Sequence, residues 1–292
     1  MIIYVNGCSH SIGLGKYSWS YVLGKSLCRS IMYISNKGLN EKDSIQYHKE
    51  QNTLYNFSDS GKGNDMIFHE TLEFLSKCKD NNIKPDYVFI QWSGPSRYSI
   101  QEIHGGIRFN NPGDTKLELL NFEPYASRTT LSYIFSLQEI LKKQNIEYYF
   151  CCYMELDNES KYYSIWNQID FDKFISFDTK THPLLEGFRN NMRKYLYVVD
   201  GAGHPNYFGH WFLANKFLEK IKIDGCDIGF FGELNNETMN PTMSPKSNKY
   251  TDIVSYYGDN MINQNRVKEL AINELLKEGT LEDKNNIRKT LF

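Results

Sequence analysis

Short apolar runs alternate with longer segments of helical period along roughly the first 220 residues, and this alternation constrains the fold more than any other feature. The runs are apolar at consecutive positions, as in strands that are buried on both faces of a parallel sheet. Such strands, joined by amphipathic helices, predict an α/β fold with a doubly wound, mainly parallel sheet in a three-layer α/β/α arrangement of flavodoxin-like type. The strand candidates are 2–5, 54–57, 87–92, 148–154 and 195–199. The helix candidates are 67–78, 131–141 and 214–221.

Two long excursions, at about 98–125 and 155–193, follow strand candidates at the end where open α/β sheets hold their ligands. The first contains the turn signal Asn110-Asn111-Pro112-Gly113-Asp114, which predicts a hairpin between residues 107–109 and 117–120. Either excursion is a candidate lid or substrate-contacting insertion.

The composition changes after Ile223, where Gly, Asn, Met, Pro and Ser dominate until about Asn248 before a helical pattern returns. We therefore expect two parts: an α/β domain over 1–223 and a C-terminal extension over 224–292. The extension is a candidate docking segment for a partner protein. Packing of the extension on its own domain is equally compatible with the sequence.

Charge and composition exclude several classes of partner. The net charge of −2 provides no electrostatic footprint for nucleic acid or an anionic membrane. The N-terminus has no secretory signal pattern, and no run approaches the ~18 apolar residues of a membrane span, so we expect a location in the cytoplasm or a virion. The six cysteines form no Cys-x-x-Cys pair, which favours reduced core thiols. A metal is not expected, because no His/Glu or Cys/His cluster has ligand spacing. An organic cofactor is not expected either, because the phosphate-loop pattern ending at Gly24-Lys25-Ser26 and the dinucleotide pattern at Gly13-Leu14-Gly15 each lack a required glycine.

The first strand candidate runs directly into Asn6-Gly7-Cys8-Ser9-His10-Ser11. A hydroxyl group at the carboxyl end of a strand, just before a helix, is placed where a nucleophile would be exposed. The pattern is not the Gly-x-Ser-x-Gly elbow, because position 11 is Ser. An ordinary helix-capping serine is the alternative interpretation.

The second strand candidate leads into a segment that contains Gly61, Gly63 and Asn64. Glycines allow backbone N–H groups to approach a reacting oxygen. A plain turn with an Asn64 cap is the alternative.

A third polar segment, beginning Asp200-Gly201-Ala202-Gly203-His204, lies between the last strand candidate and a helix. An acid and an imidazole on one loop suit a base and its orienting partner for a distant hydroxyl. Asp178 and His182 repeat the same spacing. We prefer Asp200 and His204, because a clear strand precedes them and a clear helix follows.

The order of these segments resembles the SGNH (GDSL-like) hydrolase family over most of residues 1–222. Residues 7–11 are similar to its Gly-Asp-Ser-x-Ser block, Gly61 to the block II glycine, and residues 204–210 to block V. The resemblance implies that Ser9 is the nucleophile, His204 the general base and Asp200 its orienting partner. It also implies that the N–H groups of Ser9 and Gly61 form the oxyanion hole.

The sequence departs from the family pattern at two places. Asp200 and His204 are four apart, whereas the family spacing is three. No Asn follows the third strand candidate, so Ser93, Gln91 or a backbone N–H would have to replace that oxyanion donor. Asn64 and Arg97, in the same segments, are the candidate substrate-binding residues.

The resemblance implies a serine esterase that hydrolyses a small ester, such as an O-acetyl group on a carbohydrate, through an acyl-Ser9 intermediate. The alternative is a binding or structural module of a larger assembly, such as a virus particle, that keeps the fold with an incomplete site. The missing Asn and the C-terminal extension motivate this alternative.

Overall fold

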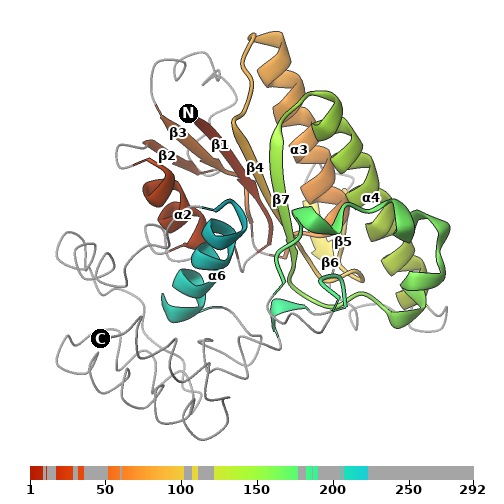
Figure 1. Ribbon diagram of the computed structural model, residues 1–292. Coiled ribbons are helices and arrows are strands. Elements are labelled where there is room, and N and C mark those ends of the chain that lie inside the picture. The colour runs from red at the N-terminus through yellow and green to blue at the C-terminus, as the bar shows by residue number, and fades with distance from the viewer. Residues whose placement is uncertain are drawn as a thin grey trace, which may run out of the picture. The chain divides into compact units, whose positions relative to one another are not determined.

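The computed structural model describes residues 1–8, 11, 18–28, 32–35, 52–59, 61–101, 107–110, 122–176, 182–185, 187–189, 205 and 207–222. The chain divides into two compact units, Met1–Phe188 and Arg189–Phe292. The first unit contains the sheet (Figure 1). The boundary expected at 223/224 stays a prediction, as does docking through 224–292, which lies outside the described residues.

A sheet of five parallel strands forms the centre of the first unit, in the order β2-β3-β1-β4-β7. The α/β fold with a parallel sheet is therefore confirmed, and four of the five predicted strands are present within two residues of their expected bounds. The edge strand β2 was missed, because its four residues alternate apolar and polar positions too briefly to give a signal. The candidate at 195–199 lies outside the described residues. The strands are β1 (Ile2–Asn6), β2 (Met32–Ser35), β3 (Thr53–Asn56), β4 (Tyr87–Trp92) and β7 (Glu147–Cys152).

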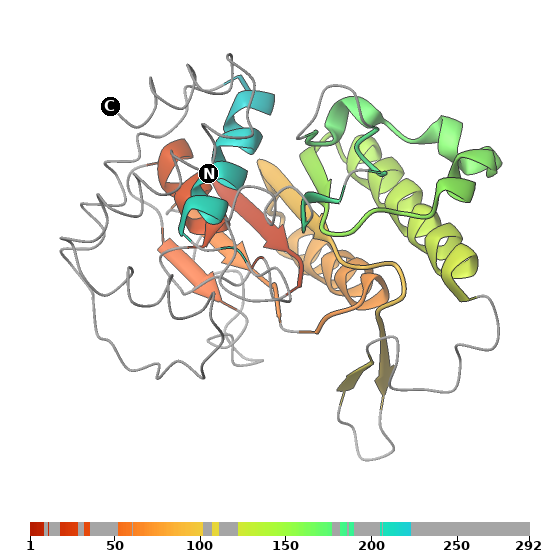
Figure 2. The same cartoon turned by 90° about the horizontal axis from the view of Figure 1, so that it is seen from below.

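Helices cover both faces of this sheet, as the sequence predicted. Successive strand residues point to opposite faces, and Tyr4 stacks on Phe74 of α3 (Asn64–Asp80) with ring centroids 4.2 Å apart. On the other face Asn56 donates a hydrogen bond of 3.1 Å to Ser20 of α2 (Trp19–Leu27). Figure 2 shows α2 on the opposite side of the sheet from α3 and α4 (Phe122–Lys143). The three layers thus follow from strands that are apolar on both faces.

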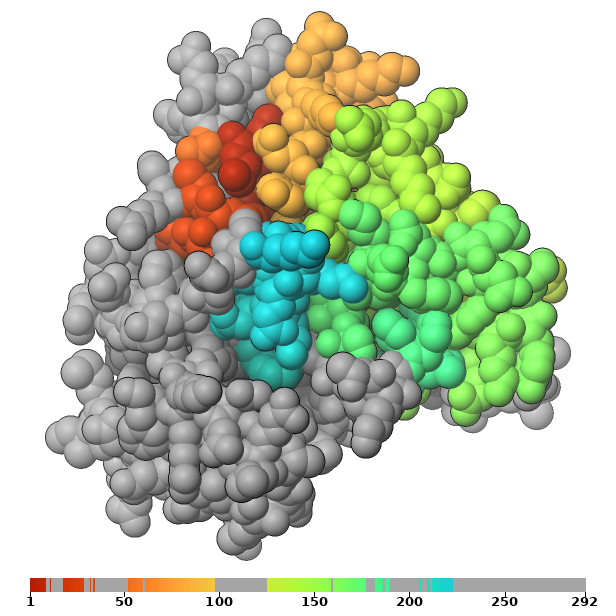
Figure 3. All heavy atoms as spheres, viewed as in Figure 1, coloured from red at the N-terminus to blue at the C-terminus, as the bar shows by residue number. Residues whose placement is uncertain are grey.

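The excursion after β7 packs on α4 and does not extend into solvent. It forms three short 3-10 helices, η5 (Asn158–Tyr162), η6 (Ser164–Gln168) and η7 (Phe171–Lys173). The buried amide of Gln138 on α4 donates to the Gln168 carbonyl at 2.6 Å and accepts from the Asp170 N–H at 2.9 Å. Figure 3 shows these segments forming one continuous surface with α4.

The first excursion contains a two-stranded antiparallel sheet. Strand β6 (Ile107–Asn110) coincides with the strand expected at 107–109, and it pairs with β5 (Tyr98–Gln101), a strand that the sequence analysis did not predict. The expected pairing of residues 107–109 with 117–120 stays a prediction, because 117–120 lie outside the described residues.

The predicted helices at 67–78 and 131–141 are confirmed within α3 and α4, and the one at 214–221 is confirmed to within a residue by α6 (Tyr207–Lys220) of the second unit. Among the described residues, no helix has the length and apolarity to cross a membrane. Cys78, Cys151 and Cys152 form no disulfide, and Cys151 and Cys152 are buried as expected.

The connections leave β1 and β4 on opposite faces of the sheet. The chain passes from β1 into α2 on one face, and from β4 into α4 on the other. Apart from β2, the order β3-β1-β4-β7 is that of a flavodoxin-like sheet. Open α/β sheets bind ligands where neighbouring connections diverge in this way, so the carboxyl ends of β1 and β4 are where a site is expected.

Candidate active site

Three polar segments meet at the carboxyl ends of β3, β1 and β4. The segment after β1 begins at Gly7, the one after β3 at Phe57, and the one after β4 at Ser93. The N–H of Asp59 donates to the Gly7 carbonyl at 3.2 Å, and the N–H of Phe57 donates to the Val5 carbonyl at 2.8 Å. Gly61 and Ser93, two of the predicted oxyanion donors, therefore follow the strands that flank β1.

The predicted catalytic residues Ser9, Asp200 and His204 lie outside the described residues, so their roles stay predictions. The alternative acid Asp178 also lies outside them. The alternative base His182 is described, and its ring packs against Trp166 and Phe171 with centroid distances of 4.4 and 4.0 Å. Its Nδ1 accepts the Leu184 N–H at 3.3 Å, and burial lowers its pKa. These contacts account for His182 as a packing residue.

The residues on either side of Ser9 are held by buried polar contacts. Ser11 donates its N–H to the Cys8 carbonyl at 2.9 Å and its Oγ to the side-chain oxygen of Gln91. The amide of Gln91 in turn donates to Cys8 Sγ at 3.4 Å. Both amide atoms of Gln91, an alternative oxyanion donor by sequence, are thus engaged beneath this segment.

Gly7 is required by close packing. A Cβ at this position would lie 3.0 Å from Gln91 Cβ and closer still to Ser11 Oγ. Real Cβ atoms rarely approach so closely, so any side chain at position 7 would push the segment away from β4.

Gly61 occupies a backbone conformation that favours glycine. Its φ of 76° lies in the left-handed region, which costs other residues about 1–2 kcal/mol. Upstream, Asn56 Oδ1 accepts the Ser58 N–H at 3.0 Å and fixes the exit from β3. Asn56 before this loop and Gly61 within it therefore each constrain its backbone locally.

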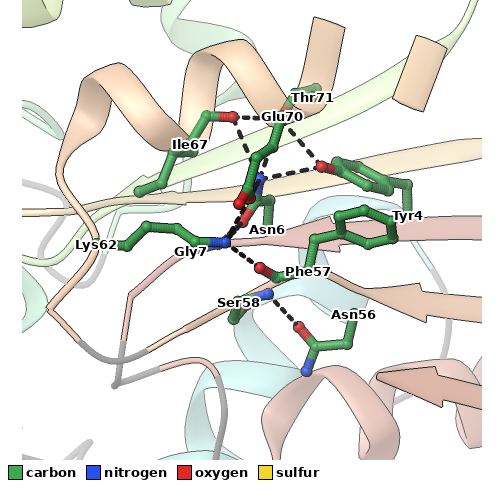
Figure 4. Close-up of polar contacts among 10 residues, drawn as sticks. All are labelled: Tyr4, Asn6, Gly7, Asn56, Phe57, Ser58, Lys62, Ile67, Glu70 and Thr71. Carbon is green, nitrogen blue, oxygen red and sulfur yellow. Dashed lines mark hydrogen bonds and ion pairs between the residues drawn. The ribbon is translucent and has the colours of Figure 1, made fainter. Parts of the chain in front are cut away.

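Lys62, which directly follows Gly61 in the sequence, is a buried lysine whose polar contacts are drawn in Figure 4. Lys62 Nζ donates to three acceptors: Asn6 Oδ1 at 3.3 Å, the Phe57 carbonyl and the carboxylate of Glu70. The side chain of Lys62 is 1% exposed and that of Glu70 is 16% exposed. Burial lowers the pKa of Lys62, and the charge of Glu70 opposes that shift.

Asn6 connects this lysine to the segment after β1. Its Oδ1 accepts the Gly7 N–H at 2.8 Å as well as the Lys62 ammonium. Its Nδ2 donates to Tyr4 Oη at 3.0 Å and to the Ile67 carbonyl and Glu70 Oε2, each at 3.2 Å. Every polar atom of the Asn6 side chain therefore has a partner within the fold.

The predicted substrate-binding residue Asn64 is buried and holds the segment after β4. Its Oδ1 accepts the Ser93 N–H at 2.7 Å, and its Nδ2 donates to the Ser93 carbonyl at 3.2 Å and to Thr130 Oγ1 at 3.0 Å. Because these bonds occupy the amide, they support a positioning role. Direct contact of Asn64 with substrate stays a prediction.

Three donors at this edge are buried without a hydrogen-bond partner among the described residues: Ser58 Oγ, Ser93 Oγ and Arg97 Nη1. Arg97 also lies over the Tyr153 ring, 6.0 Å from its centroid. Buried donors are normally paired, so these three are polar groups that the described part of the fold leaves unsatisfied. No group of three His, Cys, Asp or Glu side chains suited to a metal is found in the described part of the chain.

Sequence reasoning missed Asn6, Lys62 and Glu70. The one available signal was a lysine between two glycines, in a segment already suspected of carrying an oxyanion donor. No periodicity relates that lysine to Glu70 or to Asn6.

No protein-family model matches the sequence, and a search of curated proteins finds no significant relative. A search of solved structures finds similar folds at low sequence identity. One is the acetyl xylan esterase AlAXEase, which is 15% identical with a TM-score of 0.42; the match covers 76% of this chain and 100% of that one. The psychrotrophic esterase EstA from Pseudoalteromonas sp., solved with monoethylphosphonate, has 14% identity, a TM-score of 0.42, and coverage of 76% and 96%. TesA has 13% identity, a TM-score of 0.41, and coverage of 76% and 98%. Similarity at this level identifies neither the catalytic residues nor the substrate of this chain.

Proposed function

We propose that this chain is a serine ester hydrolase that acts on a small ester through an acyl-Ser9 intermediate. The observation that carries the proposal is the meeting of three segments at the divergence of the β1 and β4 connections. Ser9 follows Gly7 and Cys8 at the end of β1, Gly61 follows β3, and Ser93 follows β4. A nucleophile flanked by two donor segments is the arrangement that acyl transfer requires.

Ser9 Oγ attacks the carbonyl carbon of the ester while His204 accepts the hydroxyl proton, and Asp200 orients the imidazole. The oxygen of the tetrahedral intermediate receives hydrogen bonds from the N–H groups of Ser9 and Gly61. His204 then returns the proton to the leaving alcohol. A water molecule then loses a proton to His204 and attacks the acyl carbon. The bond from that carbon to Ser9 Oγ breaks, His204 returns the proton to Ser9 Oγ, and the acid leaves.

The hydroxyl of Ser93 replaces the Asn that the family pattern has after this strand. Its N–H is occupied by Asn64, but its Oγ is buried and unpaired among the described residues. A buried hydroxyl gains most by donating to a group that becomes negative during the reaction. Asn64 acts by fixing the Ser93 backbone from both sides.

Arg97 binds an oxygen of the substrate outside the reacting ester. Its Nη1 has no acceptor within the described part of the chain, and the Tyr153 ring supports the guanidinium plane. A sugar hydroxyl or ring oxygen would satisfy this donor. An O-acetyl group on a carbohydrate is therefore the proposed substrate class, consistent with the sequence resemblance.

Hydrolysis of p-nitrophenyl acetate by wild type, Ser9→Ala and Ser132→Ala tests the proposal. Ser132 is an exposed serine on α4 whose hydroxyl donates to the Arg128 carbonyl of the same helix, so it provides a matched control. We expect wild type and the control to be equally active, and Ser9→Ala to be inactive while still folded. Mass spectrometry after treatment with a serine-directed phosphonate should locate the adduct on Ser9. Equal rates for Ser9→Ala and wild type, or no turnover by wild type, would contradict the proposal.

A further inference from the structure

The ion pair of Lys62 and Glu70 lies beneath the candidate site and has no part in the proton transfers described above. Three acceptors surround Lys62 Nζ, and an ammonium group has three N–H donors. All of its protons are therefore used in fixed bonds. This arrangement holds the amine in its charged form and leaves no lone pair to act as a base.

Each acceptor of Lys62 belongs to a different element. Asn6 ends β1, Phe57 follows β3, and Glu70 lies in the second turn of α3 (Figure 4). One buried cation thus joins the two neighbouring strands to the helix that covers them. A hydrophobic pair could fill the same volume at similar stability, so burial of charge here needs a reason other than stability.

The connection to the proposed chemistry passes through a single oxygen. Asn6 Oδ1 accepts from the Gly7 N–H at 2.8 Å and from Lys62 at 3.3 Å. Gly7 lies two residues before Ser9, and Lys62 directly follows Gly61. Gly7 and Lys62 therefore share the acceptor Asn6 Oδ1. Each of them lies within two residues of a backbone N–H that is assigned to the oxyanion hole.

We propose that Lys62 is a positioning residue which, with Glu70 and Asn6, sets the separation of the Ser9 and Gly61 N–H groups. This inference rests on the proposed esterase function. Its physical basis is that a displacement of about 1 Å in a catalytic group can cost ~10²-fold in rate. A polar network with directional bonds fixes that distance, whereas an apolar contact allows it to vary.

The test compares wild type with Lys62→Met/Glu70→Met, which removes both charges and so leaves no buried unpaired ion. The matched control makes the same change at Lys77 and Glu73, an ion pair on α3 whose side chains are 60% and 64% exposed. We expect the buried double variant to keep a melting temperature close to that of wild type. Its kcat should fall ~10²-fold with KM within about threefold, because oxyanion contacts act in the transition state. If the buried double variant had both the melting temperature and the kcat of wild type, the ion pair would have no effect on catalysis and the inference would be overturned.

A second comparison applies if the double variant does not fold. Glu70→Gln keeps an acceptor oxygen for Lys62, whereas Glu70→Met does not. We expect kcat of the Gln variant to exceed that of the Met variant at least tenfold. Equal losses in the two variants would overturn the inference.

Hydrogen exchange separates failure of this inference from failure of the proposed function. Ser9-dependent turnover by wild type tests the function alone. Whatever that result, the amides of residues 57–64 should exchange at least tenfold faster in a variant without the ion pair than in the Lys77/Glu73 control. In the variant without the buried ion pair, the amides of residues 71–80 should exchange at the wild-type rate. Unaltered exchange at 57–64 would reject the positioning role even in an active enzyme.

Discussion

Replacement of Lys62 by Met alone should destabilise the protein strongly. The substitution removes the ammonium group and leaves the Glu70 carboxylate, Asn6 Oδ1 and the Phe57 carbonyl without their shared donor. Loss of one partner from a buried ion pair typically costs about 3–5 kcal/mol, because the other charge stays buried and unpaired. The lower end, about 3 kcal/mol, applies here because Glu70 is 16% exposed and keeps some contact with water.

Urea and thermal unfolding followed by circular dichroism measure this loss. For domains of about 150–250 residues, each kcal/mol shifts the melting temperature by roughly 2–4 °C, so a decrease of about 6–12 °C is expected. Lys77→Met, at a side chain that is 60% exposed, should change stability by no more than about 0.5 kcal/mol. If the free energy of unfolding of Lys62→Met were within about 1 kcal/mol of the wild-type value, the reasoning would be refuted. Such a result would mean that Glu70 without Lys62 is not a costly unpaired charge.

Three further predictions concern the site and the core. Gly61→Ala should lower stability by about 1–2 kcal/mol, because φ is 76°, and lower kcat by ~10² through the displaced N–H; wild-type kinetics would exclude this N–H as a donor. Arg97→Met should raise KM for an acetylated sugar about tenfold and leave kcat within about threefold, as expected for a contact made equally in ground and transition states. A fall in kcat at unchanged KM would contradict that role. Burial raises the pKa of Tyr55 to about 12 from an ordinary value of 10.0. Above pH 10 the unfolded chain therefore loses a proton that the folded chain keeps, and the free energy of unfolding decreases as the pH rises. At pH 11 this loss is about 1 kcal/mol and should be absent in Tyr55→Phe; parallel pH–stability curves from urea unfolding for the two proteins would show the assignment to be wrong.

The strands and helices were accessible from sequence because each is encoded locally. Residues 87–92 are apolar at nearly every position, and the side chains of α3 repeat at helical spacing, so both elements follow from short windows of sequence. The same reasoning places Gly61 and Ser93 after strands. Chain order in a parallel sheet then brings them to one edge without knowledge of any contact.

Pairing between elements was less accessible. The sequence indicated a strand at 107–109, but it did not indicate β5, the strand with which β6 pairs. The short edge strand β2 takes its conformation from β3, its hydrogen-bonded neighbour, and not from its own four residues. Both cases depend on competition between alternatives whose energies are set by non-local contacts.

The sequence by itself determined the class of fold and the edge of the sheet at which chemistry is expected. Only the tertiary structure decided that Lys62 is a buried cation, that Asn6 bonds to both it and Gly7, and that Asn64 holds Ser93. The physical reason is that burial and hydrogen-bond partners depend on residues distant along the chain. Asn6 and Lys62 are 56 positions apart, and they meet because β1 and β3 are neighbours in the sheet.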